Sequence, residues 1–175
     1  MIRTLCIIYS LSLWSRLSIV LLGLFSSNAY PQATVTDTDM KSMYCTRVQV
    51  HLKNGLQPMV QYFESVMPKS PELIEMRNEL SRIERDIKRM QDYLMTRARI
   101  VGASAYSQSV LVAANRGDSD IATQRRCVEE CGDTSNKDGT PNFAKVDACQ
   151  AGCKRKIGDV LSRIQSCDKV DWLPF

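Results

Sequence analysis

The stretch that decides the fold runs from Cys127 to Cys153 and reads CVEECGDTSNKDGTPNFAKVDACQAGC. It contains two Cys-x-x-x-Cys pairs, Cys127 with Cys131 and Cys149 with Cys153, separated by 17 residues. Residues four apart lie one above the other on a helix, so each pair presents two sulfurs at consecutive turns. Two such helices packed antiparallel can close two nested bridges, Cys127 to Cys153 and Cys131 to Cys149. The stretch therefore predicts a disulfide-stapled helical hairpin.

The residues that flank the cysteines also fit a hairpin over 118–170. Gly132 can end the first helix directly after Cys131, and Thr140-Pro141 supplies an N-cap and a proline at the first helical position of the second. From there apolar residues recur at spacings of three and four: Phe143, Val146, Cys149, Cys153, Ile157, Val160, Ile164 and Cys167. The pattern predicts that the cysteines lie on the buried face of this helix.

The chain has seven cysteines, of which Cys6 lies in the N-terminal leader considered below. The remaining six are an even number, which in an exported protein indicates disulfides rather than reactive thiols. Because the hairpin accounts for four of them, Cys45 and Cys167 pair by remainder. Zinc is the rival interpretation, but structural zinc sites usually use the shorter Cys-x-x-Cys spacing. We predict three disulfides, with no metal and no cofactor.

The longest periodic pattern follows Ser70-Pro71-Glu72, which combines a capping hydroxyl, a proline in the first turn and an acid near the positive end of the helix dipole. Apolar residues then recur as Leu73, Met76, Leu80, Ile83, Ile87, Met90 and Leu94. The sequence predicts a long amphipathic helix over 70–115, with Ala98 to Ala114 as its continuation or a closely packed second helix. The 73–94 heptad stripe suits a coiled-coil partner or the protein's own helices, and three heptads favour the latter.

The segment before the long helix, 36–67, is predicted to be helical as well. Met40, Met43, Tyr44, Val48 and Leu52 fit one face of a helix that ends near Asn54-Gly55. A β-hairpin is the competing interpretation, because Val48, Val50 and Leu52 alternate and Asn54-Gly55 suits a tight turn. Met59 to Met67 then forms a short helical segment before Pro68. The helix would place Cys45 on an inner face, where it can meet Cys167.

The N-terminus has the features of a targeting segment. Residues 1–36 contain no acid, Arg3 and Arg16 precede an apolar run from Leu17 to Phe25, and small residues follow up to Ala29. This predicts a secretory signal peptide, 1–29, cut after Ala29, and a secreted, periplasmic or otherwise extracytoplasmic protein. An uncleaved anchor, which would contact a membrane, and a mitochondrial targeting segment are the alternatives. Cleavage removes two arginines and lowers the net charge of +4 by two.

Length and composition limit the class of protein. The 175 residues are 44% apolar and suit one domain, 30–175, which we expect to be an all-α helical bundle with the long amphipathic helix and the stapled C-terminal hairpin. The small net charge argues against nucleic acid as a partner. His51 is the single histidine, and no nucleophile with a base, phosphate loop or metal motif accompanies it. The chain is therefore not expected to be an enzyme.

Three groups of residues are candidates for contact with a partner protein. Arg116-Gly117-Asp118 spells the tripeptide of many integrin ligands, which requires an exposed tight turn; otherwise Asn115 to Gly117 ends one helix and Asp118 or Ser119 caps the next. Lys154, Arg155 and Lys156, with Arg125-Arg126 on the facing helix, form either a basic patch that attracts anionic lipid or an acidic partner, or a solvated surface. The apolar tail from Trp172 to Phe175 folds back or docks a partner.

The twin Cys-x-x-x-Cys stretch from Cys127 to Cys153 resembles two groups of helical-hairpin proteins. One is the small Tim chaperones of the mitochondrial intermembrane space, and this resemblance implies an oxidatively folded, non-enzymatic carrier or assembly factor. The other is the α-hairpinins, which implies a secreted defence or inhibitor peptide. The expectation for function is thus an exported, non-enzymatic binding or assembly protein. A mitochondrial assembly subunit and a secreted ligand or inhibitor are the alternatives.

Overall fold

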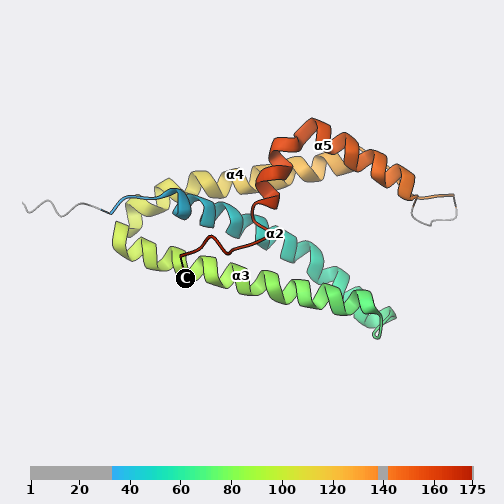
Figure 1. Cartoon of the computed structure of the whole chain (residues 1–175), viewed down its shortest axis with the longest axis horizontal. Helices are drawn as coiled ribbons and strands as arrows, with labels where there is room; N and C mark the ends of the chain where they lie inside the picture. Colours follow the sequence, from blue (N-terminus) through green and yellow to red (C-terminus); the bar gives the residue numbers. More distant parts are fainter. Residues whose placement is uncertain (1–32, 138–141, 175) are drawn as a thin grey trace, which may run out of the picture. The chain divides into compact units, whose positions relative to one another are not determined.

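In the computed structural model of the chain, residues 33–137 and 142–174 are described, and the predicted leader 1–29 lies outside them. The described part is all-α, with the helices α2 (Asp37–Val66), α3 (Pro71–Val101), α4 (Ala103–Glu129) and α5 (Phe143–Gln165) (Figure 1). The expected helical bundle with a long amphipathic helix and a stapled C-terminal hairpin is confirmed. Within 33–137 and 142–174, no helix is long and apolar enough to cross a membrane.

The helix α2 begins with a capping box and is longer than the sequence predicts. The Thr36 hydroxyl accepts from the Asp39 amide (3.2 Å), and the Asp39 carboxylate accepts from the Thr36 amide (2.7 Å). The predicted end near Asn54-Gly55 is wrong, because α2 continues through it and through Pro58 to Val66. Asn54 is exposed, so water can bond the carbonyl that Pro58 leaves without a donor. The competing β-hairpin is also excluded.

The predicted long helix over 70–115 is two helices. Ser70 caps α3 by accepting from the Leu73 amide (3.1 Å), and α3 ends where Gly102 adopts a φ of 97°. A left-handed φ is accessible to glycine without a Cβ clash, which allows the chain to turn and start α4. The 73–94 heptad stripe faces inward: Leu73, Ile83, Ile87, Met90 and Leu94 are buried, and Met76 and Leu80 are half-buried. It packs within the chain, against α2, and is not a free surface.

The C-terminal hairpin differs in detail from the expected one. After α4, Gly132 adopts a φ of 64°, and α5 begins at Phe143 with Asn142 as its N-cap, two residues after the predicted cap. Phe143 was expected on the buried stripe, but its side chain is 75% exposed because it stands in the first turn, beyond the bridges. The helix is kinked at Ile157, whose φ is −131°.

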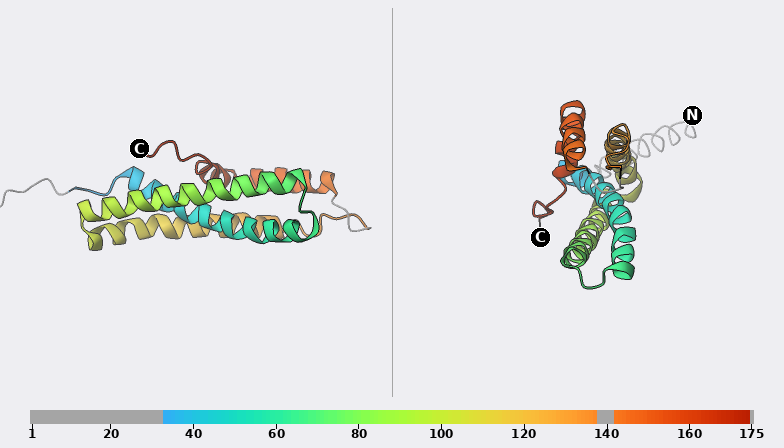
Figure 2. Two further views of the ribbon diagram at one scale, coloured as in Figure 1. Left: turned by 90° about the horizontal axis from the view of Figure 1, so that it is seen from below. Right: turned by 90° about the vertical axis from the view of Figure 1, so that its right-hand side faces the viewer.

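The core lies where α2 meets α3 on one side and α4 on the other. The segment after α5 returns over this core and buries Val170 and Leu173. Figures 1 and 2 show that α2 and α4 run side by side at first and then diverge, so that the C-terminal ends of the two helices lie apart. Cavities lined by both α2 and α4 lie between the helices, and the candidate site is built around them.

Candidate functional site

The helices α2 and α4 pack tightly against each other at Gly117. A Cβ at this position would lie 3.0 Å from the Tyr44 carbonyl oxygen and 3.0 Å from the Arg47 Cβ. Carbon atoms in contact normally lie about 3.5–4.0 Å apart, so the absence of a side chain allows this crossing. Beyond Gly117 the two helices separate, and the cavities lined by both of them there form a cleft.

On the cleft side of the crossing, Asp118 joins α4 to α2. Its carboxylate accepts hydrogen bonds from the Arg47 guanidinium (2.9 Å) and lies 3.0 Å from the His51 Nε2. Burial by itself would raise the pKa of Asp118, but the hydrogen bonds from Arg47 and His51 lower it below its ordinary value. The carboxylate is therefore ionised at neutral pH and committed to these partners.

On the other side of the crossing, the buried Asp120 joins three helices. It accepts a hydrogen bond from the Tyr44 hydroxyl of α2 (2.9 Å) and a bidentate pair from Arg163 of α5 (2.8 and 2.9 Å). Burial raises the pKa of Asp120, but the bonds from Arg163 and Tyr44 outweigh it, so the net direction is downward. Burial, together with the bond to Asp120, raises the pKa of Tyr44. Bidentate Arg–carboxylate pairs fix geometry, so Asp120 sets how α5 lies on α2 and α4.

These contacts account for the tripeptide Arg116-Gly117-Asp118. All three residues lie inside the continuous helix α4, which contradicts both the exposed tight turn and the alternative boundary between two helices. Gly117 is buried against α2, and Asp118 is paired with Arg47 and His51. Gly117 and Asp118 serve the packing of α2 against α4, whereas Arg116 is exposed on α4, and this geometry gives no support to an integrin-type ligand.

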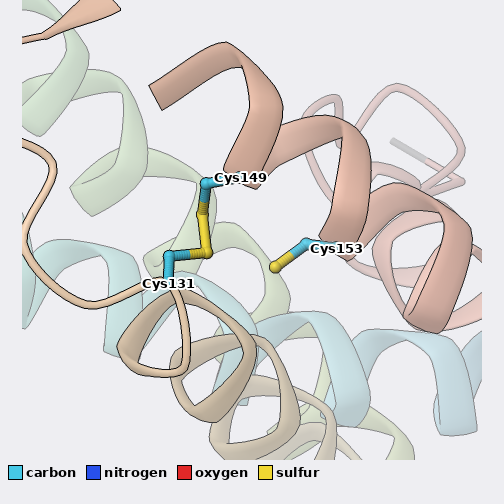
Figure 3. Close-up of side chains that lie close together, drawn as sticks. All are labelled: Cys131, Cys149 and Cys153. Atoms are coloured by element: carbon cyan, nitrogen blue, oxygen red, sulfur yellow. A yellow bond between two sulfur atoms is a disulfide. The ribbon is translucent and has the colours of Figure 1, made fainter. Parts of the chain in front are cut away.

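Three disulfides are present in the pairing predicted from the sequence. Cys45 joins Cys167, Cys127 joins Cys153 and Cys131 joins Cys149, with Cα–Cα distances of 5.2, 5.8 and 5.7 Å. Figure 3 shows the Cys131–Cys149 bridge with the Cys153 sulfur beside it, and these three sulfurs lie within 4.8 Å of one another. Sulfurs joined in this way offer no thiolate to zinc. The bridges fit an oxidising, extracytoplasmic environment.

The other candidate partner residues lie in two separate places. Lys154, Arg155 and Lys156 are exposed on α5, where Lys156 binds Glu130 of α4 (3.0 Å). Arg125 and Arg126 are also exposed, on α4.

The apolar tail folds back rather than projecting. The Lys41 ammonium lies 4.5 Å from the centroid of the Trp172 ring. Gln49 donates to the Cys167 carbonyl (2.7 Å), and Arg82 donates to the Asp168 carbonyl (2.6 Å). Phe175 lies outside the described residues. The tail is thus bound to the chain's own α2 and α3.

An apolar face of α2 was missed by the sequence reasoning. Tyr44, Val48 and Leu52 pack into the core. Seven residues, or about two turns, beyond Leu52 the same face continues with Met59, Tyr62 and Val66, which are three and four residues apart. These last three, which we call the distal stripe, are 52%, 61% and 49% exposed. The helical period would have revealed the stripe had the helix been continued past Gly55.

The cleft has an apolar floor where the helices diverge. A cavity of about 260 Å³ is lined by Leu52 of α2 and by Ile121 and Val128 of α4, and Val128 is 58% exposed. A second cavity of about 380 Å³ is lined by Arg47, His51 and Asp118, among others. Pockets that bury drug-sized ligands usually measure about 300–1,000 Å³, so the first cavity is below this range and the second is at its lower end, and both suit small groups such as the side chains of a partner.

Comparison of the chain with known protein families, with curated proteins and with solved structures finds no match.

Proposed function

We propose that the chain is an exported, non-enzymatic protein that binds an amphipathic helix of a partner protein along the distal stripe. The single observation that carries the proposal is the exposure of Met59, Tyr62 and Val66 on the continuation of a face that is otherwise buried. Contiguous exposed apolar side chains mark interaction sites. Residues at spacings of three and four are the anchors by which one helix recognises another.

The frame around the stripe supports this function. Cys45–Cys167 fixes α2 near its start, and the nested bridges fix α4 to α5. A surface held rigid before binding loses less conformational entropy when a partner docks. The stripe and the cleft floor at Val128 would enclose the partner helix from two sides.

The first experiment locates the partner by position-specific cross-linking. A photoreactive phenylalanine derivative replaces Tyr62 in one variant and Ile100, an equally apolar residue that is 57% exposed at the end of α3, in the other. In the native source we expect a protein cross-linked at position 62 and not at 100. The cross-linked segment is then synthesised as a peptide and its Kd is measured.

The peptide should gain helix on binding, seen by circular dichroism, and Val66→Ser should weaken its Kd by about tenfold, because an apolar side chain leaves the interface. Ile100→Ser is the matched control and should leave the Kd unchanged. Equal cross-linking at both positions, or a peptide that binds both serine variants alike, would contradict the proposal.

The second candidate is an assembly subunit or chaperone of the mitochondrial intermembrane space. The twin Cys-x-x-x-Cys hairpin favours it through its resemblance to such carriers and assembly factors, and the exposed apolar stripe offers a surface for contact with another protein. The location of the tagged full-length protein separates the two, together with the mature N-terminus. Export with cleavage after Ala29 gives Tyr30 as the first residue, and a mitochondrial location would instead support the second candidate.

A further inference from the structure

We infer that a second site, where α2, α4 and α5 meet, binds a small monocarboxylate that carries an apolar chain. The site is a cavity of about 260 Å³ with Met40, Tyr44 and Val112 on its apolar wall and Lys41, Arg116 and Arg163 around it. It involves the first turns of α2, whereas the distal stripe occupies the last turns. It is therefore independent of the proposed partner-binding function.

The charge at this cavity is unbalanced. The acid that bonds its lining is Asp120, which is shared by Tyr44 and Arg163. Arg163 is thereby neutralised, whereas the Arg116 guanidinium makes no hydrogen bond or ion pair to any residue of 33–137 or 142–174. Lys41 contacts the ring of Trp172 and forms no ion pair with a carboxylate of residues 33–137 or 142–174. Asp120 also attracts Arg116 through space, but its oxygens are bonded to Tyr44 and Arg163, so Lys41 and Arg116 face the cavity without a hydrogen-bonded carboxylate.

Lys41 and Arg116, the cations at the cavity that are not bonded to Asp120, determine which class of ligand fits the site. A guanidinium presents a planar fork that binds a carboxylate through two parallel hydrogen bonds, and Arg116 is the fork left free. A single carboxylate between Arg116 and Lys41 satisfies this site, whereas a dianion would also need Arg163, which is already bound to Asp120. The apolar wall, extended by the exposed Val112, favours a ligand with an alkyl chain over an inorganic anion.

Trp172 offers a direct reporter of binding. The Lys41 ammonium stands over its ring at 4.5 Å, so a carboxylate that draws Lys41 toward the cavity changes the environment of the indole. The chain has two tryptophans, and the other is Trp14. The variant W14F leaves Trp172 as the single emitter in the full-length chain.

The experiment titrates the oxidised full-length W14F chain with octanoate, octanol, acetate and inorganic phosphate, by Trp172 fluorescence and by calorimetry. We expect saturable binding of octanoate, and at least tenfold weaker binding of the other three, since each lacks either the charge or the chain. Equal binding of octanol, or no saturable octanoate signal in either measurement, would overturn the inference.

Variants then assign the site. R116Q should weaken octanoate binding about tenfold, because one charge-assisted pair of hydrogen bonds is lost. R126Q makes the same charge change at an exposed residue of α4 outside the cavity and should bind like the parent. R116K keeps the charge but not the planar guanidinium, so its affinity for octanoate should lie between those of R116Q and the parent. It replaces R116Q in the test if R116Q does not fold. Equal affinity of R116K, R126Q and the parent would place octanoate elsewhere.

Discussion

The tight contact between α2 and α4 at Gly117 can be tested by adding a single methyl group. In Gly117→Ala the new Cβ meets the Tyr44 carbonyl oxygen and the Arg47 Cβ at 3.0 Å. Both atoms belong to or adjoin the backbone of α2, so the helices must separate by several tenths of an ångström. Inserting a methyl group into a packed interface costs about 1–3 kcal/mol of unfolding free energy.

Alanine also favours the helix over glycine by about 1 kcal/mol, which partly offsets this cost. Gly55→Ala is the matched control, because Gly55 lies inside α2 and a Cβ there meets nothing within 4 Å. We expect Gly55→Ala to stabilise by about 1 kcal/mol and Gly117→Ala to destabilise by about 0–2 kcal/mol. The helix-propensity contribution cancels in the difference between the two variants, which isolates the steric cost of about 1–3 kcal/mol.

The measurement is thermal unfolding of the oxidised protein by circular dichroism. For a domain of this size 1 kcal/mol corresponds to about 3 °C, so the two Tm values should differ by about 3–9 °C, with Gly55→Ala the higher. Equal stabilisation by both alanines would show that α2 and α4 do not cross at Gly117, and the account of the tripeptide would fail with it.

The remaining predictions concern bridges and pH. Replacing Cys45 and Cys167 by alanine should cost about 5 kcal/mol against about 3 for Cys131 and Cys149, because the closed loops differ in length, 122 residues against 18; equal losses in guanidinium unfolding would contradict the entropic reasoning. The folded-state pKa of Asp120 lies below its unfolded value of about 3.9, so its ion pair stabilises the fold above about pH 4, and this contribution is lost as the pH falls through the folded-state pKa. Asp120→Asn should therefore lower Tm at pH 7 and flatten its fall in acid, and an unchanged acid profile would count against the pair. When the protein is denatured without reductant and treated with an alkylating reagent, none of the six bridge cysteines should be alkylated.

The disulfide pairing was predictable because it depends on local geometry. Cysteines four residues apart share one face of a helix whatever the rest of the chain does, and a short loop forces the two helices to be antiparallel. Both nested bridges and the Cys45–Cys167 bridge are confirmed. Partner, compartment and processing do not follow from such geometry and stay predictions.

The helix boundaries were less predictable because breaking residues act in competition with packing. Gly55 and Pro58 disfavour a helix by about 1 and 3 kcal/mol, yet α2 continues because Val60 beyond them is buried and α2 packs along α3. Gly102 has no proline or turn cluster beside it, yet its φ of 97° ends α3. Local sequence reports the cost of a break and not the contacts that outweigh it.

The tripeptide Arg116-Gly117-Asp118 also shows that local sequence does not reveal contacts with a distant helix. Nothing within three residues reveals that another helix crosses at Gly117, some 70 positions away from its contacts at Tyr44 and Arg47. The distal stripe was not predicted for a different reason. The helix was expected to end near Gly55, and this boundary divided one continuous apolar face into two short segments.

The positions of the bridges explain why the distal stripe can stay exposed. Small helical proteins usually need every apolar face for their core, because burial has to offset the entropy of ordering the chain. Here Cys45–Cys167 and the nested bridges restrict the unfolded chain instead, and none of them spans the last turns of α2. The cross-links stabilise the frame without covering the distal stripe, so Met59, Tyr62 and Val66 remain exposed.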